Sequence, residues 1–479
     1  MREVCERAVE TALAAGAEYA DARVVVRRDQ FVSTKNGEID SAADSETEGL
    51  GVRVIVGGAW GFAGEPELAD RGAEGAARRA VEFARASAAR TRRPVALADR
   101  PAEQGECETP FERDPIEVPL EEKIELLLRA EAAARHEDVK IVETAVRAMR
   151  EQRAFRSSDG ADVVQTFVET GAGIDAYAQG DGRVQIRSYP SAHSGSSAAA
   201  GWEYVERLGL EREAPRVAEE AAALLHADPC PATVTTVVID PEQTALQVHE
   251  SVGHPTELDR IYGTEAAYAG TSFLSPDDLG SLRYGWEHMN ITADATTPQG
   301  LGTYAWDDEG VRGERSPVVR AGILEGFLTS RETAALLGEG HGGSMRADGW
   351  SRMPLVRMTN LHLEPGEGSL DDLLADVDEG IYLATNKSWS IDDKRLNFQF
   401  GTQIAWEIRN GKLGRMLRDA TYMGKTPEFW SSLDAVAGPE AWKMHGLTNC
   451  GKGQPGQSAH VSHGASPARF RNVRVGVRQ

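Results

Sequence analysis

The chain has 479 residues, too many for one ordinary hydrophobic core, so two or three domains are expected. Hydrophobic residues make up 41% and charged residues 27%, a globular balance that excludes a mostly disordered chain. The 75 acidic and 52 basic residues give a formal net charge of -23, which disfavours nucleic acid and anionic membrane surfaces as partners.

The first residues, MREVCERAVETALAAG, follow a helical pattern interrupted by charge and lack the apolar core of a secretion signal. No apolar stretch approaches the length that spans a bilayer. The four cysteines are widely spaced and match no disulfide framework: Cys5, Cys107, Cys230 and Cys450. We therefore expect a soluble, cytoplasmic protein with no membrane partner.

Residues 1–90 predict a first unit of helices and strands. A helix over 2–16 is followed by two strands that turn at the Asn-Gly pair 36–37, and by a second strand pair over 50–64. An Ala- and Arg-rich helix around 66–88 completes the unit.

The segment 91–118 is rich in proline and charge and predicts a linker. Residues 119–228 then repeat the order of the first unit. A helix over 119–136 precedes strands that turn at the Asp-Gly pair 159–160, and a helix over 203–226 follows.

Residues 229–479 predict a different order of elements from the two preceding units. One buried strand leads into a helix, and many short strands with glycine turns follow. Turns are expected at 307–310, 320–324 and 409–413, and helices near 331–337, 369–376 and 426–436. The acid pair Asp307 and Asp308 is expected in a solvated turn. The pattern predicts an α+β fold in which two smaller helix/strand units precede one large strand-rich C-terminal domain.

The stretch QVHESVGHPTELD, residues 247–259, places two histidines and two glutamates just after this buried strand. In an HExxH zinc protease, histidines four apart on a helix bind one ion, and the glutamate activates water. Here His249 and His254 are five apart, about 140° around an ideal helix. Gly253 and Pro255 disfavour regular α geometry, and a wider π-type turn would bring both rings onto nearly one face. An ordinary polar helix end is the alternative.

A catalytic zinc ion usually has three protein ligands and one open position, so a third ligand must come from elsewhere. The candidates are Cys450, His460, His463, Glu257 and Asp259. Cys450 is favoured because a thiolate binds zinc strongly and its glycine-rich surroundings allow close approach, although it could also be an inert buried thiol. His460 and His463 fit solvated loop positions equally well.

A series of motifs runs in order along the C-terminal half: HESVGHPTELD, YAGTSFLSPDDLGSLRYG, GTYAWDDEGV, AGILEGFLTSRETA, PLVRMTNLHLEPG, GIYL and NCGKGQPGQ. The N-terminal half contains VSTKNGEIDSA and GLGVRVIVGGAWGFA. With these motifs the C-terminal half resembles the TldD/PmbA family of metalloproteases, and specifically its TldD type, and the N-terminal half resembles the family more diffusely.

The resemblance implies zinc as the cofactor, with His249, His254 and Cys450 as its ligands. It implies Glu250 as the general base that takes a proton from the attacking water. The expected activity is hydrolysis of unfolded or flexible peptides and small proteins. The expected partner is a PmbA/TldE-type homologue in a heterodimer, or a second copy in a homodimer. Because the ligand set is complete, the resemblance argues against an inert subunit.

Three alternative functions remain for the chain. A cysteine hydrolase would use Cys450 with His460 or His463 as its base. A non-catalytic regulatory or binding subunit would hold a structural metal in a closed site of four ligands. A nucleotide-binding protein is least supported, because the glycine-rich stretch 338–349 does not lead from a strand into a helix with a phosphate-binding lysine.

Overall fold

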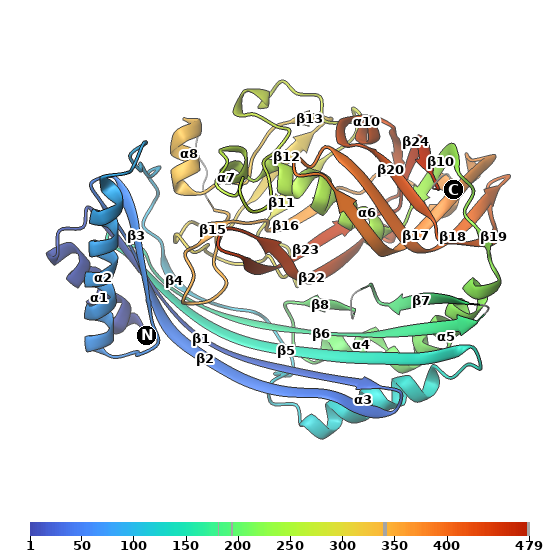
Figure 1. Ribbon diagram of the computed structural model, residues 1–479, viewed down its shortest axis with the longest axis horizontal. Helices are drawn as coiled ribbons and strands as arrows, with labels where there is room; N and C mark the ends of the chain where they lie inside the picture. Colours follow the sequence, from blue (N-terminus) through green and yellow to red (C-terminus); the bar gives the residue numbers. More distant parts are fainter. Residues whose placement is uncertain (181, 193–194, 339–342, 477–479) are drawn as a thin grey trace.

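The structure is a computed structural model that describes residues 1–180, 182–192, 195–338 and 343–476. A long curved sheet from the N-terminal half carries the strand-rich C-terminal half on its concave face (Figure 1). Strands outweigh helices, and the predicted α+β class is confirmed.

The first unit follows the predicted order, but the two strand pairs share one long central strand. Asn36 and Gly37 form the predicted turn, with φ of 52° and 87°. The first part of the following strand is exposed, and Leu50, Val52 and Val54 alternate into the core in its last part before the next turn at Gly57 and Gly58. The elements are α1 (Arg2–Ala14), β1 (Tyr19–Lys35), β2 (Glu38–Val56), β3 (Ala59–Glu65) and α2 (Asp70–Ala88).

In the second unit, the predicted helix over 203–226 is wrong in one respect. Gly209 adopts a left-handed φ of 61° and divides it into two helices. The segment 91–118 also adds a strand, which pairs in parallel with β6. The elements are β4 (Gln104–Glu108), α3 (Leu120–Ala133), β5 (Val139–Ser157), β6 (Asp162–Gly180), β7 (Arg183–Tyr189), β8 (Ser196–Ala198), α4 (Glu203–Leu208) and α5 (Leu210–His226).

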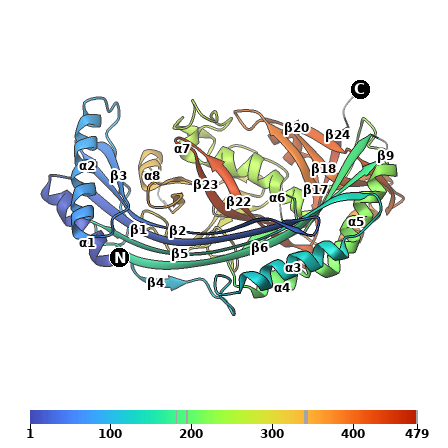
Figure 2. The same cartoon turned by 60° about the horizontal axis from the view of Figure 1, so that its bottom comes forward.

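Both units contribute to a single sheet with the strand order β3-β2-β1-β5-β6-β4, in which β7 and β8 also pair with β6. The junction is the long antiparallel pairing of β1 with β5. Helices α1 and α2 cover one end of the sheet, while α3, α4 and α5 lie along the outer face at the other end (Figure 2). Each helix group has its own apolar core against the strands.

The C-terminal half contains an eight-stranded and a six-stranded sheet. The larger sheet has the order β17-β10-β24-β20-β18-β19-β9, and β21 also pairs with β24. Its strands are β9 (Asp228–Pro229), β10 (Thr233–Ile239), β17 (Glu379–Ile391), β18 (Asn397–Arg409), β19 (Lys412–Arg418), β20 (Thr421–Lys425), β21 (Leu433–Val436) and β24 (Ala468–Val475).

The smaller sheet has the order β13-β12-β11-β16-β23-β22, so β22 is an edge strand. Its strands are β11 (Ile291–Asp294), β12 (Arg315–Arg320), β13 (Ile323–Leu324), β16 (Asn360–Leu363), β22 (Lys443–Lys452) and β23 (Gln457–Ala465). Within the described residues, a two-stranded pair and five α-helices complete the half, besides short π and 3-10 turns: β14 (Met345–Arg346), β15 (Leu355–Val356), α6 (Pro241–Val248), α7 (Leu258–Ile261), α8 (Arg331–Leu337), α9 (Leu370–Ala375) and α10 (Thr426–Ser431).

Two local predictions in this half need correction. The helix expected over 426–436 ends at Ser431, because Leu433–Val436 pairs with β24 instead. Asp307 and Asp308 are buried, not solvated. Of the glycine-rich stretch 338–349, residues 339–342 lie outside the described residues.

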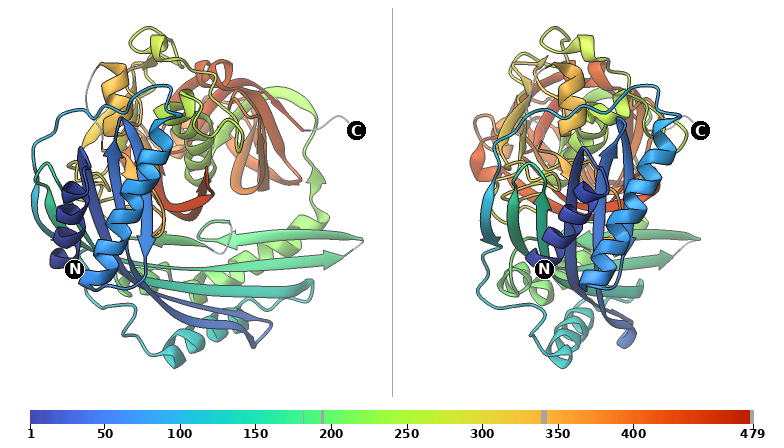
Figure 3. Two further views of the ribbon diagram at one scale, coloured as in Figure 1. Left: turned by 60° about the vertical axis from the view of Figure 1, so that its left-hand side comes forward. Right: turned by 90° about the vertical axis from the view of Figure 1, so that its left-hand side faces the viewer.

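The burial of Asp308 has a clear physical reason. Its carboxylate accepts hydrogen bonds from Arg153 of β5 at 2.5 and 2.6 Å and from the Ala347 backbone N–H at 2.7 Å. The charge is therefore compensated where the long sheet meets the C-terminal half. Seen from the end of the molecule, the C-terminal half sits over the long strands (Figure 3).

Helix α6 lies between the two C-terminal sheets, in contact with β17 on one side and with β16, β22 and β23 on the other. A largely apolar cluster that includes Val248 and Val252 surrounds it. This packing fixes the helix that carries the histidine pair.

Among the described residues, no helix is long and apolar enough to cross a membrane.

Candidate metal centre

The helix that carries the histidine pair changes its geometry between them. Asp240 caps α6 by accepting a hydrogen bond from the Gln243 backbone N–H at 2.8 Å. The helix then widens into a π-helical turn over His249–Gly253, in which the His254 backbone N–H donates to the His249 carbonyl. The widening predicted from the five-residue spacing is confirmed.

A lack of space at Gly253 accounts for its residue type. A Cβ atom there would lie 2.2 Å from the Met358 sulfur. The π turn and this close approach let the two rings share one face, with ring centroids 4.9 Å apart for His249 and His254.

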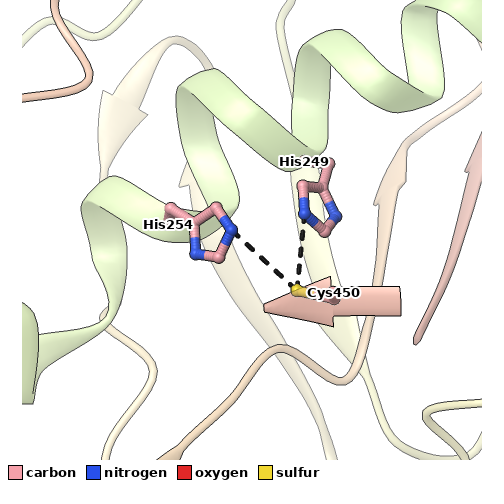
Figure 4. Close-up of side chains that lie close together, drawn as sticks. All are labelled: His249, His254 and Cys450. Carbon is pink, nitrogen blue, oxygen red and sulfur yellow. Dashed lines mark hydrogen bonds between the residues drawn. The ribbon is translucent and has the colours of Figure 1, made fainter. Parts of the chain in front are cut away.

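Cys450 completes the group from the edge strand β22, about two hundred residues further along the chain (Figure 4). Its Sγ lies 3.5 Å from His249 Nε2 and 3.9 Å from His254 Nε2, and all three side chains are buried. Zinc bonds of about 2.3 Å to sulfur and about 2.0 Å to nitrogen at a tetrahedral angle give a sulfur–nitrogen separation of roughly 3.5 Å. The donor atoms therefore fit a zinc ion.

The charge states of these donors also suit a metal. Burial lowers the pKa of His249, and burial together with Arg395 lowers the pKa of His254 well below its usual value. Burial raises the pKa of the Cys450 thiol, but Arg357 and His254 outweigh it and the net shift is downward. Neutral imidazoles and a thiolate are the forms that bind metal ions.

The other candidates for a third ligand lie beside the group, not in it. Glu257 Oε2 is 3.0 Å from His254 Nδ1, and His463 Nε2 is 2.7 Å from His249 Nδ1. Asp259 is paired with Lys452 at 2.7 Å. Each ring thus has an outer partner on the nitrogen that faces away from Cys450, the arrangement that orients metal-binding histidines.

His460 lies elsewhere. Its Nδ1 pairs with Glu169 of β6 at 2.5 Å, on the face of the long sheet. The base that a Cys450 hydrolase would need is therefore not His460, and His463 contacts His249, not the thiol. Nothing in the sequence spacing distinguished these roles.

Glu257 is expected to support metal binding through His254. Because it is completely buried and also paired with Lys452 at 3.2 Å, its carboxylate is held in place. Replacing Glu257 by Gln should weaken zinc binding by about 10- to 100-fold, the usual effect of removing an outer partner. Competition with a chromophoric chelator measures the change.

Glu364→Gln, an exchange at an ion pair that does not line the pocket, is the matched control and should bind zinc as the wild type does. Unchanged affinity in Glu257→Gln would contradict the role assigned to this carboxylate.

Glu250 follows His249 in the π turn and faces the same pocket. Its Oε2 is paired with the Arg395 guanidinium, which comes from the turn between β17 and β18. Arg395 has a φ of 62°, and its carbonyl accepts a hydrogen bond from the Thr426 hydroxyl at 2.8 Å. Nothing in the sequence indicates a role for Arg395, because no motif signals a residue brought in by a hairpin turn.

The three donors, Glu250 and Arg395 line one pocket of about 240 Å³. It is bounded by α6, β22 and the β17–β18 hairpin. A metal ion here would therefore have both a carboxylate and space for a ligand beside it.

Sequence patterns of three domains match along the chain: PmbA/TldA metallopeptidase domain 1 at residues 20–88, the central domain at 113–227 and the C-terminal domain at 232–476. The chain is 30% identical to a metalloprotease of Methanothermobacter thermautotrophicus, covering 96% of this chain and 95% of that protein. It is 29% identical to a metalloprotease of Methanocaldococcus jannaschii, with 94% and 96% covered. A zinc metalloprotease TldD homolog of Saccharolobus solfataricus is 27% identical over 50% of this chain and 51% of that protein.

Solved structures share the fold. A protein of Thermotoga maritima superposes with a TM-score of 0.77 at 20% identity, covering 99% of both chains. TldE from Thermococcus kodakarensis gives a TM-score of 0.74 at 16% identity, covering 99% of this chain and 100% of that one. The matches span all three domains. The family that the motifs resemble, TldD/PmbA, is the same one, and the chain belongs to this PmbA/TldA family of metallopeptidases.

Proposed function

We propose that this chain is a zinc-dependent peptidase that hydrolyses unfolded or flexible peptides, with His249, His254 and Cys450 as metal ligands and Glu250 as general base. The observation that carries the proposal is the convergence of these ligand atoms, all within 4.8 Å of one another, beside an open pocket. A zinc ion bound there would supply a Lewis acid for the scissile carbonyl and favour ionisation of water.

The residues of the pocket would move the protons. The Glu250 carboxylate would accept a proton from the attacking water and return it to the leaving amine. Arg395 holds that carboxylate by an ion pair and faces the same pocket, so it is also the donor available to negative charge that develops on the carbonyl oxygen.

The donor set favours zinc over harder metals, since two imidazoles and a thiolate are soft and borderline ligands. Ca²⁺ and Mg²⁺ prefer oxygen ligands. The zinc metalloprotease name of the Saccharolobus relative agrees with this choice.

Peptide binding has support in the position of β22. This strand carries Cys450 and lies at the edge of its sheet, where β8 packs beside Gly446 and its Ser196 hydroxyl accepts the Gly446 N–H at 3.0 Å. An extended peptide can add to such an edge through main-chain hydrogen bonds, which tolerate many sequences.

The TldE fold of the structural relative supports a PmbA/TldE-type homologue as partner in a heterodimer, and a homodimer is the alternative.

All four cysteines lie in the described part of the chain and are free thiols, which supports a cytoplasmic location.

A regulatory subunit with a structural metal is less well supported. A structural zinc site has four protein ligands, whereas the group in the described residues has three members and adjoins the pocket.

Removal of the metal tests the proposal. The purified chain, alone and with its TldE-type homologue, is incubated with a quenched-fluorescent flexible peptide. We expect hydrolysis that 1,10-phenanthroline abolishes and added zinc restores, because the metal is required for the chemical step. Hydrolysis that persists without metal, or no hydrolysis with zinc and partner present, would refute it.

A further inference from the structure

The pocket beside the metal centre contains a second carboxylate that the proposed mechanism does not use. Glu242 lies in the first turn of α6, and its Oε2 is buried without a hydrogen-bond partner among the described residues. Its Oε1 accepts a hydrogen bond from the Ala192 backbone N–H at 3.1 Å, and the Thr385 hydroxyl also donates to the carboxylate, which partly offsets the cost of its burial. A carboxylate oxygen that is buried without a hydrogen-bond partner costs free energy unless something binds it.

Two of the arginines near Glu242 form ion pairs with other carboxylates. Arg187 pairs with Glu220 at 2.8 Å, and Arg395 pairs with Glu250. His445, which also lines the pocket, has its pKa lowered to about 4 by burial and by Lys443, so it is neutral at pH 7.

The charge on Glu242 is accordingly poorly compensated. Burial and the neighbouring Asp240 carboxylate raise the pKa of Glu242 to about 8. A cation that entered the pocket would favour the ionised form and form an ion pair shielded from water. The chain's net charge of -23 would attract such a ligand at long range.

The rest of the lining suits a long cationic side chain. Leu246 and Leu447 offer apolar surface to a methylene stem, and the Trp389 ring borders the same pocket. Lys and Arg bury their stems against apolar groups and place their charged ends near carboxylates or aromatic faces.

The helix fixes the distance to the metal centre. Glu242 and His249 are seven residues apart, which places them on nearly the same face of α6 and about 10 Å apart along its axis. An extended peptide rises about 3.3 Å per residue. A peptide that runs along α6 would span the two groups with about three residues.

We propose that Glu242 forms a subsite that selects peptides with a lysine or arginine side chain within about three residues of the cleaved bond. The inference rests on the proposed peptidase function and adds its substrate class. The alternative for Glu242 is a purely structural role, as an acidic residue that stabilises the start of a helix.

Matched peptides separate these roles. One series carries a single lysine at each of the three positions on either side of the cleaved bond, and a second series carries norleucine there. Wild type should cleave the best lysine peptide with kcat/KM about 10-fold or more above its norleucine counterpart, and Glu242→Gln should remove most of that ratio. Glu219→Gln, the same exchange at an exposed position of α5, should keep it.

Binding of the same peptides, followed by fluorescence polarisation of labelled copies, provides a second readout. If wild type shows no lysine preference in cleavage or binding, or if Glu242→Gln keeps the preference, the subsite is refuted. A loss of thermal stability in Glu242→Gln with the preference intact would assign the structural role. If no peptide is cleaved, the peptidase proposal fails, and a lysine preference in binding that depends on Glu242 would still support the subsite.

Discussion

Replacing Glu250 by Gln is expected to lower kcat/KM for peptide hydrolysis by about 10²- to 10⁴-fold while one zinc ion per chain stays bound. The amide keeps the shape of the side chain but cannot accept the proton of the attacking water. Metal binding should persist because Glu250 is outside the donor group of His249, His254 and Cys450. The variant therefore separates catalysis from assembly of the centre.

Kinetics and elemental analysis on the same preparations check this expectation. Glu364→Gln again serves as the matched control, with wild-type turnover and metal content. Wild-type turnover in Glu250→Gln would place the base elsewhere in the pocket. Loss of zinc from the variant would make Glu250 a ligand, and the assignment of roles would have to change.

Arg395 is the ion-pair partner of the buried Glu250 side chain. A carboxylate in a buried pocket needs a partner, and the guanidinium supplies it without occupying the metal donors. The same ion pair orients the carboxylate toward the pocket that a peptide would enter. Positioning of this kind is worth several orders of magnitude in rate when it places reacting groups within contact distance.

The sequence was most informative where the relevant geometry is local. The five-residue spacing of His249 and His254, with Gly253 and Pro255 between or beside them, indicated a widened helical turn, and the structure has one. Helix periodicity and the conformational limits of glycine and proline are properties of a few adjacent residues, so they can be derived from the sequence.

Contacts between distant segments were not derivable in this way. Spacing alone left five residues open as the third ligand, and the family resemblance singled out Cys450. Its position beside the histidines depends on the pairing of β22 with β23, which shifts register between Leu447 and Cys450. The roles of Glu257, His463 and Arg395 depend likewise on segments that meet only in the folded chain.

The N-terminal half shows the same limit. The strand patterns predicted two similar units, yet not that β1 and β5 would join them into one sheet. Asp307 and Asp308 had the sequence of a solvated turn, and the long sheet buries them by bringing Arg153 to Asp308. Charge pairing across two halves of a chain leaves no periodic signal in either segment.

Replacing Cys450 by Ser should have the largest effect on the metal centre. The apparent free energy of zinc binding at a structural site is about 10–16 kcal/mol, shared among four ligands, so one ligand contributes roughly 3 kcal/mol. The zinc affinity of Cys450→Ser should therefore be about 100-fold lower than that of the wild type. A serine hydroxyl occupies a similar volume but does not ionise as the thiol does. Hydrolysis at limiting zinc should fall with metal occupancy.

The matched control is Cys230→Ser, a free thiol remote from the donor group. It should keep wild-type zinc affinity in the chelator competition, and thermal unfolding of both apoproteins would show whether either exchange damages the fold. If Cys450→Ser binds zinc as tightly as Cys230→Ser, the third ligand is another residue. Since Cys450 is the donor that β22 brings to the two histidines, that result would also remove the reason for placing the substrate beside this strand.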